Sequence, residues 1–124
     1  MAAQNKMAAS GEQNLDARMV EFLTLKINSF VKWDLIRFFH DNPHAAEIAE
    51  NIARYAGRDL GEVEPELLEM ADAHLLEVRE INQRKVFRLV NEAQTRELIR
   101  QFVEACDDRE FRVQAIHYVM KRMI

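Results

Sequence analysis

The fold of this 124-residue chain is decided by residues 75–90, whose sequence is LLEVREINQRKVFRLV. Apolar and polar side chains alternate in the first half of this stretch, as they do in a half-buried β-strand. The second half, from Val86 to Val90, is rich in residues that favour strands. A short polar turn, residues 81–85, separates the halves. The pattern therefore predicts an antiparallel β-hairpin.

Four helices are expected before the hairpin. Apolar residues recur three and four positions apart in each, which is the spacing of an amphipathic helix. The predicted helices span residues 14–29, 30–41, 45–56 and 63–74. Gly57 ends the third helix. Asp59 and Glu62 have the spacing of a capping box ahead of the fourth, which places Pro65 in its first turn.

Two further helices are expected after the hairpin, within residues 92–124, with Asp107 and Asp108 at their junction. Three glycines and two prolines are too few for a β-sandwich or barrel. The sequence thus predicts a mainly α fold with one β-hairpin. We expect a flexible tail over residues 1–12 and one domain over residues 13–124, with a core at 30–90 and flanking helices at 13–29 and 92–124.

The net charge of −4 does not indicate a nucleic-acid-binding protein, but the charges are unevenly distributed. Residues 41–72 contain nine acidic side chains and two arginines, whereas residues 79–124 contain ten basic and seven acidic side chains. The single cysteine, Cys106, cannot form an internal disulfide. No apolar signal stretch opens the sequence, and no apolar run is long enough to cross a membrane. We therefore expect a cytoplasmic protein without a membrane partner.

The element order from Phe30 to Val90 resembles that of the winged helix-turn-helix domains of ArsR-like and MarR-like regulators. The resemblance rests on four segments along the chain: Leu35 to Phe39, Glu47-Ile48-Ala49, the core positions Val63, Leu67 and Met70, and the hairpin from Leu75 to Leu89. It implies that residues 63–74 form the recognition helix and that the hairpin forms the wing. His74 stands where such domains commonly have glycine, and histidine tolerates a left-handed conformation better than most residues.

A winged helix of this kind implies double-stranded DNA as the partner and transcriptional regulation as the function. The hairpin contains four basic residues that are suited to clamp phosphate groups: Arg79, Arg84, Lys85 and Arg88. The alternative interpretation is a solvated hairpin whose charges protect its edge from pairing with another chain. In the first interpretation the protein contacts DNA through its wing.

The charge of the predicted recognition helix differs from that of a helix that reads DNA. It contains no lysine or arginine and five acidic residues, namely Glu62, Glu64, Glu66, Glu69 and Asp72. Carboxylates in a DNA groove are repelled by the phosphates. The alternative function is a protein-interaction module that binds a partner through an exposed Leu68 and its neighbours Pro65, Glu69 and Asp72.

The sequence predicts no enzyme, no metal site and no cofactor. It contains neither a glycine-rich phosphate loop nor a nucleophile motif, and its histidines and Cys106 lack the close spacing of a zinc site. Cys106 lies on the apolar face of its predicted helix, where burial should raise the thiol pKa. Trp33 is expected to pack against the first or the last helix.

The flanking helices are not needed for a minimal winged helix, and each has one apolar stripe. The resemblance implies that they form a symmetric homodimer interface. The alternative is that they pack on their own domain and leave a monomer.

Overall fold

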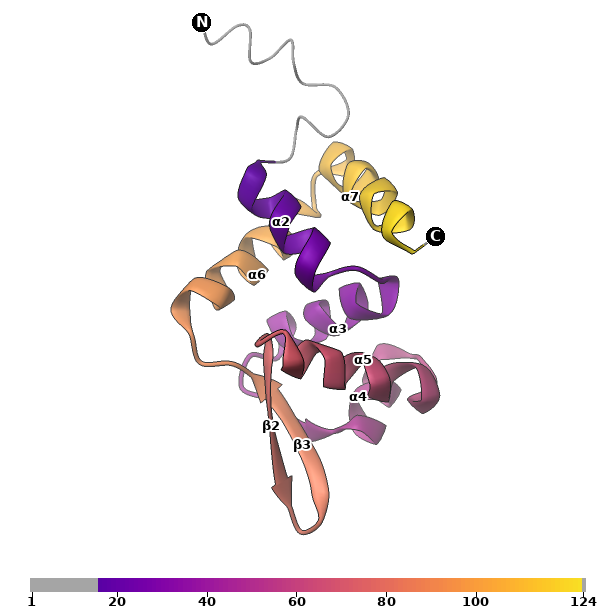
Figure 1. Cartoon of the computed structure of the whole chain (residues 1–124), viewed down its shortest axis with the longest axis vertical. Coiled ribbons are helices and arrows are strands. Elements are labelled where there is room, and N and C mark those ends of the chain that lie inside the picture. Colours follow the sequence, from indigo (N-terminus) through magenta and orange to yellow (C-terminus); the bar gives the residue numbers. More distant parts are fainter. Residues whose placement is uncertain (1–15, 124) are drawn as a thin grey trace, which may run out of the picture.

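The computed structural model describes residues 16–123, so the predicted tail at residues 1–12 lies outside the described residues. Six helices and three strands follow one another along this part of the chain (Figure 1). The helices are α2 (Ala17–Lys26), α3 (Phe30–Asp41), α4 (Ala49–Ala56), α5 (Leu60–Asp72), α6 (Ala93–Ala105) and α7 (Arg109–Arg122). The strands are β1 (Ala46–Ile48), β2 (Leu76–Ile81) and β3 (Arg84–Leu89).

The order α3-β1-α4-α5-β2-β3 is that of a winged helix-turn-helix domain, with α4 and α5 as the helix pair and β2-β3 as the wing. The mainly α fold with a hairpin is therefore confirmed. In Figure 1, α2, α6 and α7 gather at one end of the molecule and the wing projects from the other. The flanking helices thus leave the wing accessible.

One strand was not expected. The sequence predicts a helix from residue 45, but Ala46–Ile48 forms β1 and only Ala49–Ala56 is helical. Strand β1 pairs with the edge of β3 that β2 leaves open, with Ala46 opposite Arg88 and Ile48 opposite Val86, and gives the sheet order β1-β3-β2. The prediction was wrong because the backbone groups on that edge of β3 need partners, and this need is invisible in local periodicity.

Helix α5 begins at Leu60 instead of Val63, so Pro65 is inside the helix and not in its first turn. Asp59 is the N-cap residue, but its side chain makes no capping hydrogen bond. Glu62 lies 3.8 Å from Arg58 instead, and the predicted capping box does not form. The expected left-handed residue follows the end of the helix, since His74 has φ 63°. The next amide, of Leu75, donates to the Met70 carbonyl and closes the helix end.

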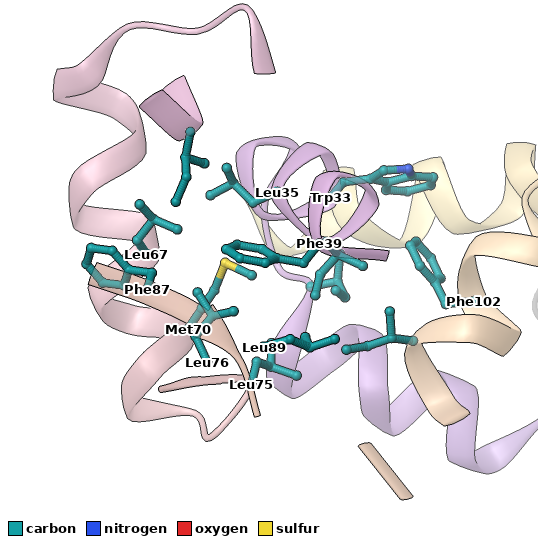
Figure 2. Close-up of a cluster of buried hydrophobic side chains, with 14 of the residues drawn as sticks. Trp33, Leu35, Phe39, Leu67, Met70, Leu75, Leu76, Phe87, Leu89 and Phe102 are labelled. Atoms are coloured by element: carbon teal, nitrogen blue, oxygen red, sulfur yellow. The ribbon is translucent and has the colours of Figure 1, made fainter. Parts of the chain in front are cut away.

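A single apolar core joins the winged helix to the flanking helices (Figure 2). Phe39, fully buried, lies in the middle of this cluster, with Met70 of α5 beside its ring. The Phe102 ring of α6 lies 5.1 Å from Trp33, 6.1 Å from Phe22 and 6.3 Å from Phe111, measured between ring centroids. The ring of Trp33 thus packs on α6 and not, as predicted, on the first or last helix, and α2, α3, α6 and α7 meet at one aromatic cluster.

Candidate nucleic-acid interface

A glycine turn sets the angle between α4 and α5. Gly57 has φ 69°, a left-handed conformation that strains residues with a Cβ. Its amide donates to the Arg54 carbonyl, and the next amide, of Arg58, donates to the Ala53 carbonyl. These bonds close the end of α4 and direct the chain into α5, so the turn holds the helix pair in the geometry of a helix-turn-helix.

The core fixes which side of α5 meets solvent. Val63, Leu67 and Met70 are fully buried. Since a helix repeats every 3.6 residues, the opposite side carries Gly61, Pro65, Leu68 and Asp72. Pro65 and Asp72 are exposed, whereas Leu68, predicted to be exposed, is half-buried and packs partly against the core. This outer side of α5 therefore contains the carboxylate of Asp72, and the exposed carboxylates of Glu62, Glu64 and Glu69 lie to either side of it.

Two of the other carboxylates neutralise a buried lysine. The Lys32 side chain of α3 is only 6% exposed, and its Nζ lies 2.6 Å from Glu69 and 3.2 Å from Glu66. The Ser29 hydroxyl donates to Glu66 at 3.0 Å, and the Lys32 ammonium donates to Asn28 Oδ1 at 2.7 Å. A buried ammonium requires such partners. Glu66 and Glu69 thus bind α5 to α3.

A third carboxylate of α5, that of Glu62, lies near Arg58 in the turn between α4 and α5. Arg58 donates from Nε to Asp34 at 2.8 Å and lies 3.8 Å from Glu62. The prediction that the acidic side chains of this helix lie away from the core is confirmed, since Glu62, Glu64, Glu69 and Asp72 are exposed and Glu66 is half-buried, but three of the five have basic partners within the domain. The sequence signal for these ion pairs is a lysine near the start of a helix that is apolar over more than half of its circumference, because such a lysine needs a carboxylate from elsewhere in the fold.

The wing splits the four predicted basic residues between two faces. Directly opposite residues of an antiparallel pair point to the same side. Arg84 is opposite Ile81. Arg79 is two positions from Ile81 and Arg88 is four positions from Arg84 along their strands, so the three arginines share one face. Lys85 is opposite Glu80 on the other face. All four basic side chains are exposed.

Hydrogen bonds and backbone conformation hold the wing in place. Arg88 donates from Nε to Glu77 on the neighbouring strand at 3.0 Å. The turn consists of Asn82 and Gln83, both with positive φ (52° and 66°), as in the tight hairpin turns that match strand twist. The turn is shorter than predicted, because Arg84 and Lys85 belong to β3.

A hollow of about 280 Å³ separates the wing from the helix pair. Its lining includes carboxylates from three elements, Glu50, Glu64 and Glu80, together with Arg84 and Lys85 of β3. The mixture of charges means that this hollow does not attract phosphate as strongly as the arginine face of the wing does.

The described residues offer little for other chemistry. Among residues 16–123 there is no group of three or more His, Cys, Asp or Glu side chains that is able to hold a metal ion. Burial raises the pKa of the Cys106 thiol to about 11, as its apolar helix face predicts, so the reactive thiolate is scarce at neutral pH. In the same part of the chain, no helix has the length and apolar character needed to cross a membrane.

Comparisons with solved structures identify the same fold. A possible transcriptional regulator from Methanosarcina mazei Go1 is similar to this chain with a TM-score of 0.55 and 15% identity, over 73% of this chain and 78% of that one. The homodimeric winged helix-turn-helix DNA-binding domain of a possible ArsR-family regulator from Mycobacterium bovis has a TM-score of 0.58 and 15% identity, over 83% and 93%. No protein-family model and no curated protein matches the chain.

Proposed function

We propose that this chain is a winged-helix transcriptional regulator that binds double-stranded DNA as a cytoplasmic homodimer and contacts it mainly through the wing. The observation that supports the proposal is the exposed arginine face of the wing, formed by Arg79, Arg84 and Arg88, beside a helix α5 in which three of the five carboxylates have basic partners within the domain. Both solved relatives named above are described as regulators or DNA-binding domains.

The arginine face would bind phosphates and thereby position the protein on the duplex. Guanidinium groups suit this role because they hold a phosphate in a bidentate fork. The start of α5 adds backbone amides at Gly61, at the positive end of a helix dipole. The outer side of α5 presents the exposed Pro65, which is suited to apolar contact in the groove and not to hydrogen bonding with base edges. Such an interface gives affinity with modest sequence discrimination.

A second copy of the chain would pack on the flanking helices. Two residues of α7, Val113 (41%) and Met120 (51%), and its C-cap residue Met123 (54%) are large, apolar and exposed. Leu25 of α2 is 57% exposed. Side chains of this kind are typical of an interface that is covered in the assembled protein. A two-fold dimer places two wings on one DNA duplex, so each protomer reads one half-site.

The alternative, a protein-interaction module that uses α5, has less support. It depends on Pro65, Leu68, Glu69 and Asp72 being available to a partner. Leu68 is half-buried, and Glu69 is 2.6 Å from the buried Lys32 ammonium. Pro65 and Asp72 alone make a small contact surface.

Titration of duplex DNA at several salt concentrations tests the proposal. Arg84→Ala with Lys85→Ala is expected to weaken binding about tenfold for every duplex sequence and to reduce the slope of log K against log salt by about 1 to 2 per protomer. The reason is the loss of one or two phosphate contacts.

The control is Arg100→Ala with Arg109→Ala, which removes the same charge from exposed positions on α6 and α7. This variant should retain nearly the wild-type slope. A wild-type protein that binds no duplex even at low salt would contradict the proposed function.

A further inference from the structure

A second basic site lies at the base of the wing, away from its tip. A hollow of about 330 Å³ opens between the loop after α3, the start of β1 and the segment that joins β3 to α6. Its ionisable lining consists of His44, Arg88 and Arg96, with the amide of Asn91 beside them. Within the described part of the chain, no carboxylate belongs to this lining.

Both guanidinium groups are held in place by bonds that use only one of their nitrogen atoms. Arg96 is half-buried and donates from Nε to the Val90 carbonyl at 2.8 Å. Arg88 donates from Nε to Glu77 at 3.0 Å. Among residues 16–123 no further hydrogen bond of either guanidinium is found, so their terminal NH₂ groups remain for a ligand.

We infer that this hollow binds a phosphate group. Two restrained guanidiniums and a neighbouring imidazole form the donor set that a tetrahedral oxyanion prefers, because each arginine fork matches two of its oxygens. A volume of this size accommodates a phosphate with a small organic substituent. The ligand is therefore either a free phosphorylated small molecule or a phosphodiester of bound DNA.

The inference goes beyond the proposed function, because phosphate binding here needs neither the wing tip nor α5. Arg96 belongs to α6 and is not one of the four basic residues of the hairpin that were predicted to contact phosphate. A free phosphorylated ligand at this position would contact both β3 of the wing and α6 of the flanking helices. It would therefore lie between the DNA-binding part and the proposed dimer interface.

Titration of the full chain with inorganic phosphate, followed by the amide signals of residues 44–46 and 88–96 in NMR spectra, tests the inference. We expect saturable shifts in the wild type and at least a tenfold loss of affinity in Arg96→Gln. Arg100→Gln is the matched control, since it removes the same charge one turn further along α6 and should leave binding unchanged. Arg88→Gln gives a second loss of affinity that does not depend on the Val90 hydrogen bond.

A parallel DNA titration at constant salt distinguishes the two sources of phosphate. Arg96→Gln weakens duplex binding more than Arg100→Gln if the ligand is a DNA phosphodiester, and equally if it is a free ligand. Wild-type spectra without saturable phosphate shifts, together with equal DNA affinities of Arg96→Gln and Arg100→Gln, would overturn the inference. Phosphate binding by a chain that binds no DNA would refute the proposed function alone.

Discussion

Replacing Glu66 and Glu69 together by glutamine is expected to lower the free energy of unfolding by about 3 kcal/mol. The double variant leaves the Lys32 ammonium, whose side chain is 6% exposed, without a carboxylate partner. The expected loss lies at the low end for a broken buried pair, because Glu69 is 62% exposed and the Asn28 oxygen still accepts from Lys32. Urea denaturation followed by circular dichroism measures the change.

Adding Lys32→Met to the double variant should restore most of the lost stability, because no buried charge then remains. The control is Glu64→Gln with Asp72→Asn, which removes two exposed carboxylates from the same helix and should change the free energy of unfolding by less than about 0.5 kcal/mol. Equal losses in the two double variants would mean that Glu66 and Glu69 are ordinary surface acids. The claim that α5 directs them toward α3 would then be wrong.

Phe102→Ala is expected to cost about 3 to 5 kcal/mol and to destabilise the winged helix together with the flanking helices. The ring is fully buried and is surrounded by aromatic side chains from α2, α3 and α7. Unfolding should remain a single transition. The midpoint from helical circular dichroism should coincide with that from the fluorescence of Trp33, the only tryptophan of the chain.

Ile81→Ala is the control for this truncation, because Ile81 lies on the wing and is 49% exposed. It should cost less than about 1 kcal/mol. If Phe102→Ala melts the helices while the Trp33 transition stays at its wild-type midpoint, the flanking helices form a separate unit. The prediction of one domain over residues 13–124 would then fail.

The features that the sequence predicted well are those that depend on neighbouring residues. The hairpin follows from the residues of 75–90 themselves, and the stop at His74 follows from the tolerance of histidine for positive φ. The raised pKa of the Cys106 thiol follows from the amphipathic spacing of its helix. Each of these features depends on residues that are close together in the sequence.

The features that could not be predicted from the sequence depend on contacts between distant segments of the chain. Strand β1 has only three residues, too few to show a period, and it forms because β3 offers an open edge. The partners of Lys32 lie on another helix, 37 positions away in the case of Glu69. Local spacing places Glu62, Glu66 and Glu69 outside the core, but it does not specify which neighbouring helix they face.

This difference changes the functional interpretation. Three of the five carboxylates of α5, those of Glu62, Glu66 and Glu69, pair with Lys32 or Arg58 within the domain, which reduces the negative charge that this helix would present to DNA. The arginine face of the wing stays exposed and contains Arg79, Arg84 and Arg88. Glu64 remains beside the wing, in the hollow between the wing and the helix pair, and limits how closely a phosphate approaches there.

Duplex DNA is expected to meet the wing and the start of α5. The most direct measurement is a titration of the isotope-labelled full chain with a short duplex at low salt, followed by backbone amide shifts. We expect the largest shifts at residues 79–88 and at Gly61, and small shifts along Arg109–Arg122 of α7. Shifts confined to α7, or an unchanged spectrum at saturating duplex, would contradict it.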